Sequence, residues 1–246
     1  LYIIENNCIR DKEDRESIMQ SVEKAFVVKE AGTQSSQRLM LGLLSWEVYV
    51  IFGVAVFLRF FQLQTTEFDT DQADLFRMAH DAVAYGLIPL TSNNSSINIL
   101  NPPGFLYFLM PAAALTSHPL AAAITVGLFT TATSLLTYFF TRRYFGRFTA
   151  TIATLLCVTA TVPLKYSRGI WQPNILPFFV LLFMFFIYRG AVERHRGWFL
   201  PTMALFGVMY QLHPSTLSLG VLVVLALVMA PGTVRWREVI LAALAI

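Results

Sequence analysis

The sequence predicts an all-α membrane protein whose helices cross the bilayer several times. Only 13% of the 246 residues are charged, against about 25% in a typical soluble domain. The mean hydropathy is +0.59, and uncharged runs long enough to cross a lipid layer recur after residue 40. Because these runs are evenly apolar, they predict helices and exclude the alternating strands of a membrane β-barrel.

The charge and the cysteines exclude two other classes of protein. The net charge of +3 comes from basic residues in short clusters between apolar runs, so we expect no nucleic-acid partner. The sequence has two cysteines, Cys8 and Cys157. Because they are far apart and Cys157 lies within an apolar run, a disulfide framework is not expected.

Residues 1–40 are predicted to form a polar cytosolic tail, and residues 41–246 a transmembrane domain. The tail has the mixed charge and low hydrophobicity of a disordered segment. The alternatives are a regulatory tail, or sequence upstream of a start at Met40. The last apolar run begins at Val239 and reaches only to Ile246, so we expect a domain truncated at its C-terminal side.

The first predicted span covers residues 41–63, which is long enough for a hydrocarbon layer of ~30 Å. Basic residues precede it, so the positive-inside rule places its N-terminal end in the cytoplasm. The interval 64–102 then lies outside the cytoplasm. It carries five acidic residues and one basic residue, Arg77, which suits that side.

Later basic clusters alternate between heavy and light, and this pattern predicts the remaining spans. We assign the heavy clusters (142–147, 189–196 and 235–237) to the cytoplasm and the light segments (166–174 and 213–214) to the outside. Only one crossing then fits between residues 102 and 142, so the short run 103–115 is predicted to lie at the outer interface. The six full spans are predicted at residues 41–63, 120–141, 148–164, 169–188, 197–212 and 214–234, with a seventh starting at Val239.

The first extracytoplasmic loop, residues 64–119, is predicted to hold two amphipathic juxtamembrane helices. In residues 71–85, apolar and charged side chains separate onto two faces at helical spacing. Asp69 offers N-cap chemistry before this helix, and Gly86 offers a stop after it. The second helix is the run 103–115, and a polar loop joins the two.

Several short sequence pieces, in this order, resemble those of a known family of membrane enzymes. They are Asp71-Gln72, residues 86–89 (Gly-Leu-Ile-Pro), residues 101–104 (Asn-Pro-Pro-Gly), residues 142–146 (Arg-Arg-Tyr-Phe-Gly), and Tyr166-Ser167-Arg168 with Trp171. The set resembles glycosyltransferases of the C-type membrane fold. Its nearest likeness is to bacterial relatives of the dolichyl-phosphate-mannose protein mannosyltransferases (glycosyltransferase family 39) and of the lipid A aminoarabinose transferases.

The resemblance implies an inverting enzyme of a bacterial or archaeal plasma membrane. It would transfer a sugar from a polyprenyl-phosphate carrier to an acceptor hydroxyl on the extracytoplasmic side, the acceptor being a protein, a lipid or a polysaccharide. Such a reaction needs a carboxylate that takes the hydroxyl proton. It also needs positive charge or a divalent metal ion at the leaving phosphate, and a groove that admits the polyprenyl chain from the bilayer.

Asp71 matches the family's catalytic aspartate, and Asp69 is the second candidate base. Structural roles stay open for both, because a first-turn aspartate stabilises a helix by ~0.3–1 kcal/mol through the helix dipole and a loop aspartate serves as an N-cap. Gln72 departs from the family, which usually has an acidic residue there. Asn101 is neutral where lipid A-type members usually carry a lysine. Both departures weaken a specific assignment to lipid A chemistry.

The candidates for contact with the donor phosphate are Arg168, Lys165, Arg59 and Asn101. Arg168 and Lys165 flank one predicted outer span end, and Arg59 lies near the outer end of the first span. Basic side chains near span ends also snorkel to the interface without any ligand, so both interpretations stay open.

The candidates for contact with the sugar or the acceptor are Gln72, Trp171, Gln172 and His213. An aromatic belt at the membrane interface explains Trp171 equally well. Asp71 and His213 are the candidate ligands of a metal ion.

Two alternatives to an active enzyme remain. A transporter or flippase of lipid-linked sugars should carry ionisable groups at mid-membrane, whereas here they lie near span ends and the acidic ones gather outside. An inactive fragment of the enzyme is the other alternative. The distribution of charge favours the glycosyltransferase.

Overall fold

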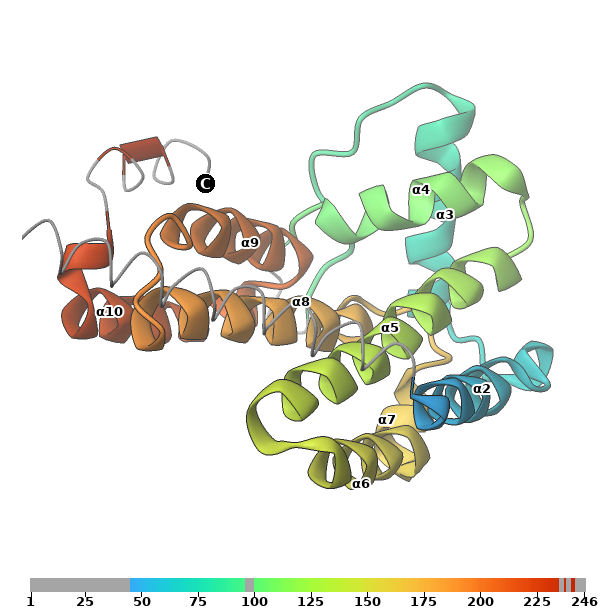
Figure 1. The fold of residues 1–246 in the computed structure, drawn as a ribbon. Helices are drawn as coiled ribbons and strands as arrows, with labels where there is room; N and C mark the ends of the chain where they lie inside the picture. The colour runs from blue at the N-terminus through green and yellow to red at the C-terminus, as the bar shows by residue number, and fades with distance from the viewer. Residues whose placement is uncertain (1–44, 96–99, 235–236, 238–239, 242–246) are drawn as a thin grey trace, which may run out of the picture. The chain divides into compact units, whose positions relative to one another are not determined.

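The computed structural model describes residues 45–95, 100–234, 237 and 240–241 (Figure 1). The chain divides into two compact units, Leu1–Val48 and Tyr49–Ile246. The predicted tail at residues 1–40 and most of the apolar run after Val239 lie outside the described residues. Within the described residues the secondary structure is helical and contains no β-strand, which confirms the all-α prediction.

The helices follow one another along the chain, and the longest interval between them is residues 85–103, before α4. They are α2 (Trp46–Phe60), α3 (Thr70–Ala84), α4 (Gly104–Leu115), α5 (Leu120–Phe145), α6 (Arg147–Thr159), α7 (Thr161–Tyr166), α8 (Gln172–Ile187), α9 (Phe199–Leu212) and α10 (Gly220–Met229). The chain also has the 3₁₀ segments η1 (Leu63–Thr65), η3 (Pro214–Leu219) and η4 (Pro231–Thr233) and the π-helical turn η2 (Tyr188–Val192).

Two of these segments are long and apolar enough to cross a membrane by length and composition. They are Leu120–Phe145 and Gln172–Val192, and the described part of the chain adds four shorter apolar helices. α8 packs against both α5 and α9, and Figure 1 shows α9 lying along α8. The count of six spans and a seventh stays a prediction.

The helix predicted at residues 71–85 is confirmed as α3. The Asp69 side chain caps it by accepting a hydrogen bond from the backbone N–H of Gln72 at 2.9 Å, and the chain leaves it through Gly86, whose φ is +64°. Leu75 and Ala79 are buried on one face, as the pattern predicts, while Arg77 is exposed on the other. Its position at a membrane surface stays a prediction.

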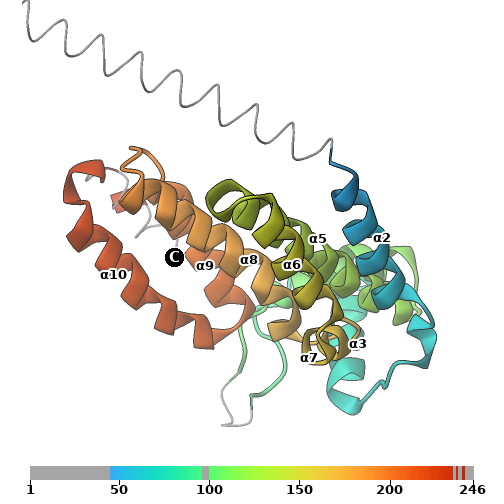
Figure 2. The same cartoon turned by 60° about the horizontal axis from the view of Figure 1, so that its bottom comes forward.

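The run at residues 148–164 differs from its prediction as a single span. α6 ends at Thr159, and α7 begins at Thr161 after an extended residue, Ala160, with ψ 129°. Pro163 explains the break, because its ring has no N–H and would clash with the carbonyl of Thr159 four residues earlier. α7 therefore starts a new direction, and this change brings its last turn beside the start of α3 (Figure 2).

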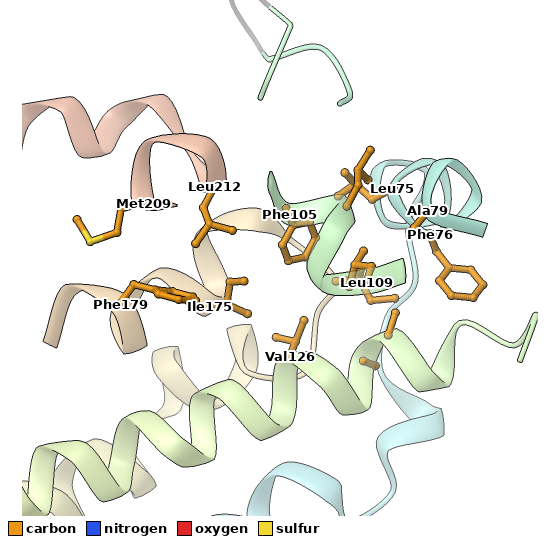
Figure 3. Close-up of a cluster of buried hydrophobic side chains, with 14 of the residues drawn as sticks. Leu75, Phe76, Ala79, Phe105, Leu109, Val126, Ile175, Phe179, Met209 and Leu212 are labelled. Atoms are coloured by element: carbon orange, nitrogen blue, oxygen red, sulfur yellow. The ribbon is translucent and has the colours of Figure 1, made fainter. Parts of the chain in front are cut away.

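A buried apolar cluster joins α3, α4, α5, α8 and α9 (Figure 3). Phe105 and Leu109 of α4 are fully buried within it. Figure 3 shows Phe105 between Leu75 of α3 and Leu212 of α9. The short helix predicted for the outer interface thus has one face packed into the core.

A second cluster lies at the cytoplasmic end predicted for α5 and α8. Glu193 accepts a hydrogen bond from Tyr144 at 2.9 Å and forms ion pairs with Arg189, with Arg143 at 3.5 Å and with His195 at 3.6 Å. Burial alone would raise the pKa of Glu193, but the Tyr144 hydrogen bond and the two arginine charges outweigh burial and lower it. The basic clusters at residues 142–147 and 189–196, which the charge pattern assigns to the cytoplasmic side, therefore lie next to each other.

Replacing Gly104 with alanine is expected to destabilise the protein. A Cβ at this position would lie 2.6 Å from the carbonyl oxygen of Gln211, so the α4 and α9 backbones would have to separate. Overpacking of this kind costs about 1–3 kcal/mol, which thermal unfolding in detergent will report as a lower Tm. Gly53→Ala in α2 is the control, because no atom lies within 4 Å of its added Cβ; an equal loss in both variants would contradict the packing argument.

Candidate active site

A cavity of about 590 Å³ opens between the start of α3, α7 and the segment that follows α7. Six predicted site residues from two distant parts of the sequence line it together: Asp69, Asp71, Gln72, Lys165, Arg168 and Trp171. Figure 2 shows α3, which supplies Asp71 and Gln72, beside α7, which supplies Lys165. The break before α7 is what brings the basic residues to the acidic ones.

The acidic wall of the cavity presents two carboxylates, those of Glu67 and Asp71, that make no hydrogen bond or ion pair with a described residue. One oxygen of Asp69 is engaged as the N-cap of α3. Asp71 lies two residues further, in the first turn of α3; it is exposed, and its carboxylate makes no hydrogen bond or ion pair with any described residue. Of the two candidate bases, Asp71 therefore has both oxygens available to a ligand.

The basic wall holds a guanidinium whose charge is not neutralised. Nη2 of Arg168 donates to the carbonyl oxygens of Phe61 at 2.7 Å and Gln62 at 2.6 Å. These carbonyls end α2, where the negative end of the helix dipole favours a cation. No carboxylate of the described residues pairs with Arg168, and its Nε is buried without a partner. Lys165 lies beside it, exposed, in the last turn of α7.

Arg59 lies at a second cavity, of about 430 Å³. Its side chain is only 3% exposed, and it donates to the hydroxyls of Thr130 and Ser134 of α5, each at 3.2 Å. The remaining walls are largely apolar and come from Val162, Pro163, Pro173 and Pro177, among others.

The two cavities share a wall. Tyr166, Trp171 and Asn174 line both of them. The 590 Å³ cavity therefore has an apolar neighbour directly behind its aromatic side.

Asn101 and Gln172 line neither cavity. Both are buried and both donate to Asn93: the Asn101 amide to its carbonyl oxygen at 3.0 Å, and the Gln172 amide to its side-chain oxygen at 2.6 Å. These contacts fasten the loop before α4 to the start of α8. The sequence did not predict the burial of these two side chains, because their partner Asn93 lies in a stretch of ordinary turn composition.

His213 also lies apart from both cavities. Its Nδ1 accepts a hydrogen bond from the backbone N–H of Ser215 at 3.3 Å and contacts the Ser215 hydroxyl at 2.8 Å. Burial lowers the pKa of His213, so the ring is held neutral over a wider pH range. Across the described ranges, no group of three His, Cys, Asp or Glu side chains is placed to hold a metal ion.

Glu67 and Tyr166 line the 590 Å³ cavity but were not among the predicted site residues. Glu67 precedes Asp69 by two residues, and Tyr166 stands next to Lys165. Their positions beside predicted site residues are the sequence signal that could have identified them.

One family model matches the chain over residues 101–246, and it describes dolichyl-phosphate-mannose-protein mannosyltransferases. The chain belongs to this family. The match confirms the family resemblance and covers its pieces from Asn101 onward, whereas Asp71 lies before the matched region. Membership of the mannosyltransferase family indicates a membrane glycosyltransferase. No curated protein and no solved structure matches the chain.

Proposed function

We propose that the chain transfers a glycosyl group from a polyprenyl-phosphate sugar to an acceptor hydroxyl at the 590 Å³ cavity, on the extracytoplasmic face of the membrane. One observation carries the proposal: a free carboxylate, Asp71, and a guanidinium without a carboxylate partner, Arg168, line the same cavity. The reaction needs these two groups on opposite sides of the sugar's anomeric carbon.

In the proposed reaction, Asp71 takes the proton of the acceptor hydroxyl while the oxygen attacks the anomeric carbon. The bond between that carbon and the phosphate oxygen breaks, and the phosphate leaves with the electron pair. Arg168 and Lys165 stabilise the negative charge that develops on it. A single displacement inverts the configuration at the anomeric carbon. Asp69 keeps Asp71 in place by capping the same helical turn.

We assign the polyprenyl chain to the 430 Å³ cavity. Its walls are largely apolar, and the shared residues Tyr166 and Trp171 lie between it and the polar cavity. Isoprenoid carbons gain about 0.8 kcal/mol per buried CH₂ group in such surroundings. Arg59 makes three hydrogen bonds here, to Thr130, Ser134 and the carbonyl of Ala55, so we propose that it holds α2 against α5.

We propose a protein hydroxyl as the acceptor, since the family's description names protein mannosyltransferases. Trp171 is exposed at the rim of the cavity, where an aromatic face can stack on a sugar ring. Asp71 and His213 do not line one cavity, because His213 lines neither of the two. They therefore do not form a common site for a divalent ion. No step of the proposed reaction therefore passes through a metal.

The direct test is sugar transfer by the chain in liposomes. Polyprenyl-phosphate mannose, labelled in the sugar, is supplied with a serine- and threonine-containing peptide. We expect labelled peptide whose anomeric configuration, read by NMR, is opposite to that of the donor. Product with retained configuration would overturn the single displacement, and absence of transfer from any polyprenyl-phosphate sugar would overturn the function.

Filling the 430 Å³ cavity is expected to weaken binding of long-chain donors only. Thr133→Phe places a ring among the residues that line this cavity and excludes a few CH₂ groups, so KM for a long-chain donor should rise about 10-fold or more. KM for a donor with one or two isoprene units should not change. Leu128→Phe, at an exposed position of α5 away from both cavities, is the control; equal effects on long and short donors would contradict the assignment.

A further inference from the structure

The side-chain amide of Gln72 joins the two walls of the 590 Å³ cavity. Its oxygen accepts a hydrogen bond from the backbone N–H of Ile170 at 2.8 Å. Its nitrogen donates to the backbone carbonyl of Glu67 at 3.2 Å. Ile170 lies between Arg168 and Trp171 in the sequence and is only 1% exposed. Both ends of the amide are thus engaged with backbone groups of the protein.

Other contacts hold the same basic wall in place. The Asn174 amide donates to the carbonyl of Gly169 at 2.8 Å, and Arg168 is fixed on the end of α2. A Cβ at Gly169 would lie 3.5 Å from the Asn174 amide nitrogen and 3.7 Å from the Gln72 oxygen. Gln72 is the member of this set that comes from the acidic wall, and it follows Asp71 directly.

We propose that Gln72 is a positioning residue that sets the separation between the Asp71 carboxylate and the Arg168 guanidinium. The inference rests on the proposed function, in which these groups act on opposite sides of one carbon. Displacement by about 1 Å costs on the order of 100-fold in rate for such a pair. Asp71 and Gln72 share one helical turn, so the bond to Ile170 fixes the base relative to the segment that carries the cation.

The geometry also explains why an amide suits this position. A glutamate of the same shape would keep the acceptor for Ile170 but would replace the donor to Glu67 with a second acceptor, which repels the carbonyl oxygen. It would also place a second negative charge beside Asp71, which disfavours the ionised form of that carboxylate. Gln72, which replaces the family's usual acidic residue, therefore supplies the N–H donor that the Glu67 carbonyl needs.

The first test measures hydrogen exchange of the full chain in lipid nanodiscs and needs no enzymatic activity. Gln72→Met keeps the side-chain length but removes both hydrogen bonds, so the Ile170 amide should exchange about 10-fold faster. Gln72→Glu should leave that amide protected. Gln64→Met is the control, since Gln64 lies outside the cavity lining. Unchanged exchange at Ile170 in Gln72→Met would overturn the proposal even if sugar transfer is confirmed.

The second test is kinetic, with a polyprenyl-phosphate mannose donor. Gln72→Met should lower kcat about 10- to 100-fold while KM for the donor changes less than about twofold. Gln72→Glu should recover activity as the pH falls, because the protonated carboxyl regains a donor for the Glu67 carbonyl. Asp69, Asp71 and Glu67 are the other carboxylates that line the cavity and are present in both proteins, so the ratio of variant to wild type isolates this effect.

These results separate the two ideas. A wild-type kcat in Gln72→Met, or a Gln72→Glu ratio that does not change with pH, would overturn the positioning role while leaving the proposed function intact. If the wild type transfers no sugar, the exchange result still decides whether Gln72 joins the walls.

Discussion

Replacing Asp71 with asparagine is expected to abolish sugar transfer, lowering kcat by about 10²- to 10⁴-fold. Asparagine has the same shape but cannot take the proton of the acceptor hydroxyl. The fold should survive, because loss of the first-turn charge costs only ~0.3–1 kcal/mol. The measurement is turnover of a polyprenyl-phosphate sugar by equal amounts of inserted wild-type and variant protein.

Asp74→Asn is the matched control for Asp71. Asp74 lies on the same helix, is paired with Arg77 at 3.1 Å and does not line the cavity, so its loss should leave kcat within about twofold, as for an exposed pair. Turnover by Asp71→Asn at the wild-type rate would remove Asp71 from the catalytic role and leave Asp69 and Glu67, the other carboxylates that line the cavity, as the candidates.

Replacing Arg168 with glutamine is expected to lower kcat about 10²- to 10³-fold, the effect of losing one group that stabilises developing negative charge. Arg168 also donates to the Phe61 and Gln62 carbonyls, so the variant should unfold at a lower temperature. Arg168→Lys separates the two effects, because the ammonium keeps the charge but lacks the planar fork that reaches two carbonyls and a phosphate together. We expect it to retain part of kcat and to show a similar loss of Tm.

Arg77→Gln serves as the control for Arg168. Arg77 is exposed on α3, and its one ion pair with a described residue is with Asp74, an interaction that contributes little. If Arg168→Gln retained the wild-type kcat, the leaving phosphate would need another cation, and Lys165 would be the first candidate.

Local chemistry made α3 predictable from the sequence. A capping aspartate, one apolar face and a terminal glycine all act within a few residues of each other, so Asp69 and Gly86 mark the ends of the helix. The run at 148–164 was harder, because its apolar composition favours one long helix while the backbone of Pro163 favours a break. A count of apolar residues detects the composition that favours one long helix but not the break at Pro163.

The sequence predicted which charged residues line the site better than it predicted how they are arranged. Asp71 was predicted from its match to the family's catalytic aspartate, and Lys165 and Arg168 from their place at one predicted outer span end. Arg59 is also predicted near an outer span end, but it lies at the other cavity. It lies there because its side chain donates to the hydroxyls of Thr130 and Ser134 of α5. Gln72 was considered for its missing charge, whereas its two backbone partners become visible only in three dimensions.

The cluster around Phe105 also constrains the order in which this chain folds as it is made. Phe105 and Leu109 belong to the same buried cluster as Met209 and Leu212 of α9, which leave the ribosome much later. At ~5–20 residues per second the delay is on the order of 5–20 s, and during it the apolar faces of α3 and α4 lack their last partner. The apolar core beneath α3, the helix that carries Asp71, therefore lacks its α9 side chains until then. A ribosome that stalls before Phe199 leaves a membrane intermediate in which this part of the core is uncovered.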